Sequence, residues 1–319
     1  MTASLPFELQ HVFESFLTTE LTTIDRNGQP LTWPVTPYYR AGDDCIDVTT
    51  ALGFPKKARD AGRNPMVSLL FSDPTGSGVE RAPMVLVQGT AQVDDRDLEA
   101  NRERYVRESA EKHLAQSAPP DAVQRRFAWY FNRIYLHVRP ERVYVWPDGD
   151  STREPALLDS HMDEVRSGHD EEPDVALPAP AGGGGRWDPR IDELGRRYES
   201  AVLSVVAPDG FPFSVRVPVA ADRRSKLVRI DAEAVGAPLQ PGLACVTAHD
   251  HEPSLGWHRN FHVRGDLVQQ GDGWVMVPHR LVPGFELPPA GALTRTLLNF
   301  GKIRRFRRTA KRELTKRRG

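Results

Sequence analysis

The feature that most constrains the fold of this chain is an internal repeat. Gly28-Gln29-Pro30 returns as Gly210-Phe211-Pro212, an offset of 210 − 28 = 182, and Val87-Gln88-Gly89 returns as Val263-Arg264-Gly265, an offset of 265 − 89 = 176. Matches that keep one offset and then another, in the same strand order, are typical of a duplicated domain. The smaller offset means that the second copy has lost 182 − 176 = 6 residues between its third and fourth strands. A chain of 319 residues has room for two such domains.

Each copy is predicted to be a small antiparallel β-barrel. In the first copy, short apolar runs of period two alternate with turn signals such as Asp25-Arg26-Asn27-Gly28, which is the pattern of a strand meander. A short amphipathic helix is expected over 4–17, and a helix over 188–197 mirrors it in the second copy. Helices are also expected over 95–114 and 121–132, and the second copy lacks this pair. The fold class is therefore mainly β, with two tandem barrels and short flanking helices.

The predicted domain boundaries follow from composition. The first barrel covers 1–148, and an acidic, glycine-rich linker covers 149–186. The second, degenerate barrel covers 187–288, and a basic C-terminal helix or tail covers 289–319.

Charge and cysteine content limit the classes of function. The formal net charge of −1 argues against bulk affinity for nucleic acid. Cys45 and Cys245 lie in separate strand-like runs, which fits free thiols in a reducing compartment. The N-terminus shows no secretory signal, so a soluble cytoplasmic protein is expected. The abundance of Arg, Ala, Gly and Pro hints at a bacterial source.

The chemistry-bearing segment is 49–65, where the second copy is shorter. A strand ends at Thr49 and Thr50, a glycine-containing turn follows, and a helix begins near Pro55 with Lys56, Lys57 and Arg59 in its first turn. Helix-start N–H groups, the helix dipole and lysine charges together suit a phosphate. A solvated basic helix face is the alternative. The place of the segment, between a barrel strand and an Asn-Pro that starts the next strand, favours the phosphate site.

These segments resemble a known family. The first copy is similar to the pyridoxamine 5′-phosphate oxidase-like split barrels, which include flavin- and deazaflavin (F420)-dependent oxidoreductases. The resemblance covers about 15–147, and its stations are 25–30, 48–50, Lys56-Lys57, 64–69 and 87–91. Phe54-Pro55 replaces the Ser or Arg that usually precedes the basic pair.

The resemblance implies a cofactor site and a quaternary arrangement. It assigns Lys56 and Lys57 to binding of the cofactor phosphate. It also assigns Thr49 or Thr50, at the end of the preceding strand, to binding of the cofactor. Family members are usually dimers with the cofactor between two barrels, so the duplication implies an intrachain pseudodimer that holds FMN or F420. Whether two chains pair further, as a homodimer, stays open. The expected contributors are Arg59, Val35 and Thr36 from the first copy, and Trp257 and His258, or the loop at 250–252, from the second copy. The second copy's own turn, 230–238, carries Asp231 and Glu233 and no basic residue, so one site per chain is expected.

Two other constellations compete for a role. Cys245 and four histidines, His249, His251, His258 and His262, lie within a short span, and Cys/His clusters can hold zinc, iron or haem. No metal-binding spacing is present, so no metal site is predicted, and haem ranks below FMN and F420.

At the C-terminus, ten basic residues between Lys302 and Arg318 accompany a partial apolar stripe: Leu297, Ile303, Phe306, Ala310 and Leu314. The interpretations are a solvated tail, docking on the acidic linker, or contact with an anionic membrane or nucleic acid. The first two are favoured, and no specific nucleic-acid partner is predicted.

The functional prediction is an FMN- or F420-dependent oxidoreductase that acts on an unknown small molecule. The cofactor ring does the hydride chemistry in such enzymes, so no catalytic side chain is assigned. The alternative is a non-catalytic protein that binds flavin, F420 or haem for storage or sensing.

Overall fold

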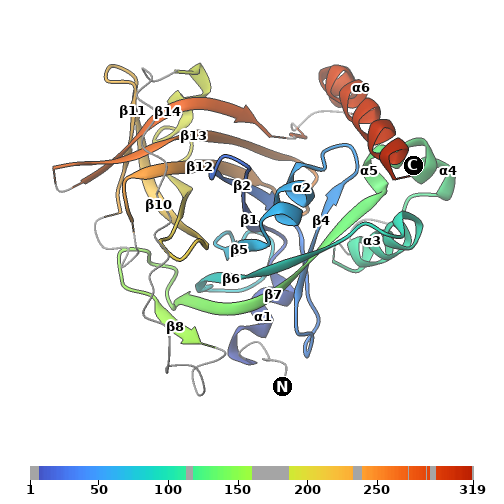
Figure 1. The fold of residues 1–319 in the computed structure, drawn as a ribbon, viewed down its shortest axis with the longest axis horizontal. Coiled ribbons are helices and arrows are strands. Elements are labelled where there is room, and N and C mark those ends of the chain that lie inside the picture. The colour runs from blue at the N-terminus through green and yellow to red at the C-terminus, as the bar shows by residue number, and fades with distance from the viewer. Residues whose placement is uncertain are drawn as a thin grey trace.

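The computed structural model describes residues 7–112, 118–159, 187–232, 239–271, 273–284, 286–287 and 292–317. The fold is mainly β and is built from two barrel-like sheets, which confirms the predicted fold class (Figure 1).

The first sheet has eight strands. Seven of them follow the order β2-β1-β5-β6-β7-β4-β3, and β8 pairs with β7 outside this order. Its elements are α1 (Phe7–Ser15), β1 (Thr19–Ile24), β2 (Pro30–Val35), β3 (Pro37–Tyr38), β4 (Ile46–Ala51), α2 (Lys56–Arg63), β5 (Met66–Phe71), β6 (Met84–Asp94), α3 (Leu98–Lys112), α4 (Asp121–Arg126), α5 (Ala128–Phe131), β7 (Arg133–Trp146) and β8 (Ala156–Asp159). The helix expected over 121–132 is interrupted at Phe127. Strand β8 lies in the segment expected to be a linker, of which 160–186 is outside the described residues.

The second sheet is a closed six-stranded barrel in the order β10-β11-β14-β13-β12-β9. Its elements are a 3-10 helix, η1 (Pro189–Glu193), then β9 (Ser200–Val206), β10 (Pro212–Asp222), β11 (Leu227–Ile230), β12 (Gly242–His251), β13 (His258–Gln270) and β14 (Gly273–Pro283), followed by the C-terminal helix α6 (Ala292–Lys316). The helix expected over 188–197 is thus only η1.

One difference between the two sheets opens the first. In the second barrel, the unbroken strand β10 pairs with β9 on one side and β11 on the other. The equivalent stretch of the first sheet is divided at Thr36 into β2, which pairs with β1, and β3, which pairs with β4. Proline removes a ladder N–H, and Pro34 and Pro37 flank this break. The first barrel is therefore split where residues 33–38 face the other half of the chain.

The contact between the barrels repeats the duplication. Thr22 pairs with Thr32 across β1 and β2, and Ser204 pairs with Ser214 at the equivalent positions of β9 and β10. Hydroxyl contacts join the pairs, at 2.8 Å from Thr22 to Ser214 and 2.6 Å from Thr32 to Ser204. All four side chains are fully buried. The two halves therefore pack as a pseudodimer about this hydroxyl cluster.

A β-bulge also occupies the same place in both copies. The β6–β7 register shifts between Gln88 and Gly89, and the β13–β14 register shifts between Arg264 and Gly265. A Cβ on Gly89 would lie 2.0 Å from the Arg139 carbonyl oxygen, and one on Gly265 would lie 2.2 Å from that of Val277. Each glycine is therefore required by a close backbone approach.

We expect Gly89→Ala to destabilise the protein by about 2–3 kcal/mol, because the backbone at Arg139 must move to admit the methyl group. Gly62→Ala is the matched control. It lies in α2, where an added Cβ would meet only Val93, at 3.9 Å, and where alanine is favoured over glycine. Urea unfolding of both variants measures the difference, and equal midpoints would contradict the assignment of the bulge.

Candidate functional site

A cavity of about 960 Å³ lies where the split edge of the first barrel faces the second. Three parts of the chain line it. The first barrel supplies residues of β2, the turn before α2, α2, α3 and the start of β7. The second barrel supplies the β12–β13 region and the end of β14, and α6 supplies Lys302, Arg305 and Phe306. Its volume is within the range of small-molecule and cofactor sites.

Lys57 is the central cation of the cavity. It lies in the first turn of α2 and is only 9% exposed, with Nζ 4.9 Å from the centre of the Trp33 ring and 5.5 Å from that of Phe54. No hydrogen bond or ion pair to its ammonium group is found among the described residues. Burial, reinforced by the positive charge of Arg133, lowers the pKa of Lys57 to about 7. An ammonium group held in this way is suited to accept an anion.

Arg133 is a second buried cation on the same cavity. It begins β7, opposite Ala51 at the end of β4. Its guanidinium carbon lies 3.8 Å and 4.2 Å from the ring centres of Tyr105 and Tyr130, and its Nε is buried without a hydrogen-bond partner in the described part of the chain. Burial alone would raise the pKa of Tyr130, but the charge of Arg133 brings it below the ordinary value. Two buried cations with no carboxylate from the described segments between them leave a place for a negative group.

Trp33, which lines the cavity, and His262, which packs against Trp33 and does not line it, carry further polar atoms without partners among the described residues. Trp33 Nε1 and His262 Nε2 are buried, and neither has a partner among the described residues. The ring centres of these two residues are 4.4 Å apart. Burial, followed by the charge of Lys57, lowers the pKa of His262 to about 3, so its imidazole is neutral at physiological pH. Orphaned atoms of this kind in a cavity are explained by a bound group or water.

Lys56 and Lys57 are adjacent in the sequence, but their side chains have different partners in the structure. Lys56 lines the cavity, but its Nζ is 2.7 Å from Asp60 and 3.8 Å from Asp25. Asp25 in turn pairs with Arg264 of the second barrel, at 3.0 Å. The charge of Lys56 is therefore already compensated, whereas that of Lys57 is not.

Most of the other predicted site residues line the cavity, and two do not. Thr49, Arg59, Val35, Thr36 and His258 line the cavity. Two others do not. The Thr50 hydroxyl donates to the Phe54 carbonyl, at 2.9 Å, and so shapes the turn from within. Trp257 is in the loop between β12 and β13, where its carbonyl accepts the Glu252 N–H, at 3.2 Å.

The C-terminal helix forms a wall of the cavity. Figure 1 shows α6 beside α4 and α5 of the first barrel, although it follows the second barrel in sequence. Phe306 stacks on Trp129, with ring centres 5.5 Å apart, and Glu313 accepts a hydrogen bond from Arg59, at 2.5 Å. The predicted apolar stripe packs inward at Ile303, Phe306, Ala310 and Leu314, while the side chain of Leu297 is outside the described residues. The helix thus docks on the first barrel.

We expect Phe306→Ala to loosen this docking, because the ring contacts with Trp129 and Phe54 are lost. A loss of about 1.4 kcal/mol gives roughly tenfold faster trypsin cleavage within α6, since cleavage follows the undocked population. Thr315→Ala, at an exposed position of the same helix, is the control and should cleave like the unaltered protein. No change for Phe306→Ala would mean that the docking of α6 does not depend on this ring and rests on its other apolar side chains and its ion pairs.

Sequence reasoning missed Arg133, Tyr130 and the α6 side chains. Arg133 follows a short aromatic helix and carries no motif of its own. Its equivalent in the second copy is found from the bulges, because Pro140 lies opposite Gly89 and Pro278 lies opposite Gly265. Arg133 lies seven residues before Pro140, and Gly271 lies seven residues before Pro278. Gly271 is therefore at the position equivalent to Arg133. The acidic turn expected at 230–238 is described only as far as Ala232.

The histidines of the second copy serve the interface. His249 Nε2 is 2.6 Å from the fully buried Glu20, and Arg216 contacts both residues. His251 Nε2 is 3.2 Å from Thr18 Oγ1, and His262 Nδ1 is 3.1 Å from Thr247 Oγ1. Within the described residues, these side chains and Cys245 form no group of three converging metal ligands.

No described helix has the length and apolar character needed to span a membrane.

No protein-family model matches the sequence, and a search of curated proteins gives no match. Among solved structures, the chain is similar to an F420 reductase, with 18% identity over 44% of this chain and 98% of that one, at a TM-score of 0.33. It is similar to a protein related to general stress protein 26, of the pyridoxinephosphate oxidase family, from Clostridium acetobutylicum, with 14% identity over 48% and 92% of the two chains, at a TM-score of 0.33. General stress protein 26 from Bacillus anthracis matches with 16% identity over 48% and 95%, at a TM-score of 0.31. Each of these proteins matches somewhat less than half of the chain.

Proposed function

We propose that this protein is an oxidoreductase that holds a phosphorylated flavin or deazaflavin, FMN or F420, in the cavity between its two barrels. The observation that carries the proposal is the pair of buried cations, Lys57 and Arg133. They face a cavity of about 960 Å³, and no carboxylate of the described residues lies between them. The type of ring comes from the resemblance of the first copy's motifs to the split barrels.

The residues present fit such a group. A phosphate between Lys57 and Arg133 would receive two charge-assisted contacts, and the first-turn N–H groups of α2 add the positive end of the helix. The orphaned Nε1 of Trp33, a residue that lines the cavity, is a further polar atom that a bound molecule can satisfy.

The roles of the chain's own groups follow from their placement. Lys57 Nζ and the Arg133 guanidinium bind and orient the phosphate. Trp33, Phe54 and Phe306 exclude water from it. Lys57, with its pKa of about 7, and the Tyr130 hydroxyl, whose pKa is lowered beside Arg133, are groups of this wall that can hold or release a proton. When bound, a flavin or deazaflavin supplies hydride exchange with the substrate, and the protein supplies position and electrostatics.

One such site is expected in each chain. The second copy has glycine at position 271 where the first has Arg133, and it lacks the six residues that include the lysine turn. Its contribution is the opposite wall of the cavity, through His258, Arg259 and Asn260.

The test is titration of purified, ligand-stripped protein with FMN and with F420, followed by absorption and by calorimetry. We expect one of the two to bind with a stoichiometry near one per chain, and the bound form to be reducible and then reoxidised by an acceptor. Binding with no turnover across acceptors would favour a storage or sensor protein. Failure to bind either compound would overturn the proposal, and a Soret band in the protein as purified would move the assignment to haem.

A further inference from the structure

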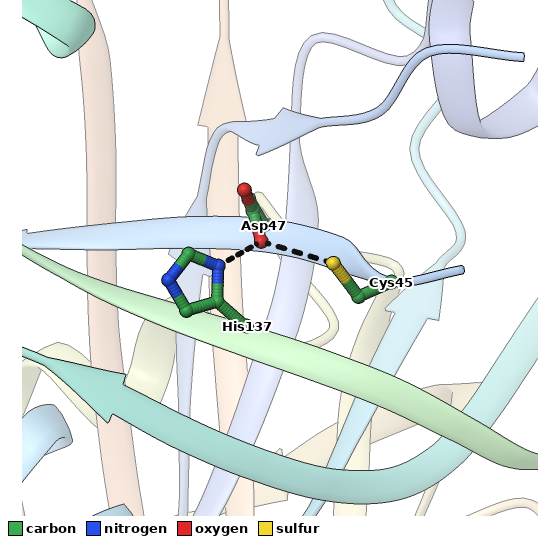
Figure 2. A group of neighbouring side chains, drawn as sticks. All are labelled: Cys45, Asp47 and His137. Atoms are coloured by element: carbon green, nitrogen blue, oxygen red, sulfur yellow. Dashed lines mark hydrogen bonds and ion pairs between the residues drawn. The ribbon is translucent and has the colours of Figure 1, made fainter. Parts of the chain in front are cut away.

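A second polar cluster, formed by Cys45, Asp47 and His137, lies on a part of the first barrel that does not line the cavity. Figure 2 shows the three side chains turned toward one another. Asp47 Oδ1 is 2.6 Å from His137 Nδ1 and 3.6 Å from Cys45 Sγ. The three ligand atoms all lie within 4.8 Å of one another.

The sheet brings these residues together. Asp47 of β4 lies directly opposite His137 of β7 in the antiparallel ladder. Cys45 precedes Asp47 by two residues, so its side chain emerges on the same face. The contact between Asp47 and His137 is not visible in the sequence spacing, because the two residues are 90 positions apart.

Residues around the cluster orient the Asp47 carboxylate and flank the His137 ring. Arg104 of α3 binds the other oxygen of Asp47, and it is held in turn by Glu108, at 2.7 Å. This leaves Oδ1 facing the cysteine and the histidine. The second ring nitrogen of His137, Nε2, faces Asp94 Oδ2, at 3.9 Å. Although this distance is too long for a hydrogen bond, Asp94 lies on the side of the ring where a histidine that binds metal usually has a supporting carboxylate.

The local charge favours a cation. Asp43 and Asp44 directly precede Cys45 in the chain, and Asp47 Oδ1 contacts its thiol. The opposing charges are Arg104 on Asp47 and Arg139, which is 3.2 Å from Asp44. A divalent ion at the centre would compensate the remaining carboxylate and the thiolate formed on binding.

We propose that Cys45 Sγ, Asp47 Oδ1 and His137 Nδ1 bind a borderline-soft divalent cation of the zinc class. Thiolate, imidazole and carboxylate are the ligands that Zn²⁺ takes in proteins, and three of them leave one position for water. Binding releases the thiol proton to solvent, and the His137 Nδ1 proton leaves to solvent from the imidazolium or moves to Nε2 in the neutral ring. Two coordinate bonds, from Asp47 Oδ1 and His137 Nδ1, then replace the hydrogen bond between these atoms. Because Arg104 and the cavity residue Tyr105 are neighbours on α3, the ion would also fix the position of that cavity wall.

The test uses Co²⁺ as a spectroscopic probe, added to untagged, metal-free, full-length protein. We expect a sulfur-to-cobalt charge-transfer band that saturates at one ion per chain and is displaced by Zn²⁺. Cys45→Ser should abolish the band. Cys245→Ser, at the chain's other cysteine, which is buried in the second barrel, should leave it unchanged.

Two further variants separate ligation from general damage. His137→Gln should weaken Co²⁺ binding by at least about 100-fold, and Asp94→Asn by about 10- to 100-fold, as for other supports of a metal-binding histidine. Thermal unfolding without metal checks that each variant is folded. No thiolate band, or a band that disappears in Cys245→Ser and not in Cys45→Ser, would overturn the proposal.

Discussion

Lys57→Ala is expected to weaken binding of the phosphorylated cofactor by about 100-fold, while Lys56→Ala changes it by less than about threefold. The two lysines are adjacent in sequence and differ only in what the fold does with them. Lys57 is buried with no anionic partner among the described residues, whereas the side chain of Lys56 is 41% exposed and already paired with Asp60. A hydrogen bond to a charged group in such a setting contributes about 1.5–3 kcal/mol, and about 2.7 kcal/mol is a factor of about 100 in affinity.

The comparison is measured by calorimetric titration of FMN and F420 at pH 6.5, where most of Lys57 is protonated. Asp60 keeps its Arg63 partner when Lys56 is removed, so the Lys56 variant is a fair control for folding. Arg133→Met should resemble Lys57→Ala, because it removes the second cation. Equal losses for both lysine variants would mean that the phosphate lies on the exposed side of the turn and not in the cavity.

Cofactor affinity is expected to fall by up to tenfold per pH unit above about pH 7. Burial first, and Arg133 second, lower the pKa of Lys57 to about 7 in the ligand-free protein, so above this pH the free lysine is increasingly neutral. A bound phosphate raises that pKa, and binding then takes up one proton. Since affinity is linked to that proton, it declines as pH rises from the free-protein value toward the value in the complex.

The same lowered pKa has a consequence for stability, with a definite sign. The folded protein binds fewer protons at Lys57 than the unfolded chain, whose lysine has its ordinary value of 10.5. The ligand-free protein therefore carries a penalty that is largest below pH 7 and disappears as pH rises to the unfolded value. Lys57→Met should raise the melting temperature of the ligand-free protein near pH 7 while it weakens binding.

Lys57→Arg isolates the titrating group, because arginine stays charged throughout this range. Its affinity should fall much less between pH 7 and 9 than that of the unaltered protein. His262, with its pKa of about 3, does not titrate there, and Tyr130, whose pKa is lowered beside Arg133, is the group left to produce any remaining slope. An unchanged slope in Lys57→Arg would show that another group in the cavity controls the pH dependence.

The sequence carried the repeat and the general place of the site. The two offsets of the repeat reappear as matched strand pairs, Thr22–Thr32 with Ser204–Ser214, and as matched bulges at Gly89 and Gly265. These features are local in each copy, so periodicity and turn residues reveal them. The lysine turn was likewise visible, because a helix start with basic residues is a short-range signal.

Tertiary structure decided which of the turn's side chains face the cavity. Lys56 and Lys57 are indistinguishable in sequence, yet Asp60 and Asp25 compensate one and leave the other unpaired among the described residues. Thr50 turned inward to the Phe54 carbonyl, although its neighbour Thr49 lines the cavity. Burial and pairing depend on residues far along the chain, and composition does not report them.

By itself, then, the sequence determined two barrels and one lysine-bearing turn, because strand period, turn chemistry and helix capping act over a few residues. Only the tertiary structure added Arg133, the wall formed by α6 and the Cys45–Asp47–His137 cluster. Each of these depends on strand pairing or packing between segments that are distant in the chain, such as Arg59 with Glu313, for which no local pattern exists. The unpaired charge of Lys57 is likewise a property of the assembled cavity, since only the fold determines which carboxylates reach it.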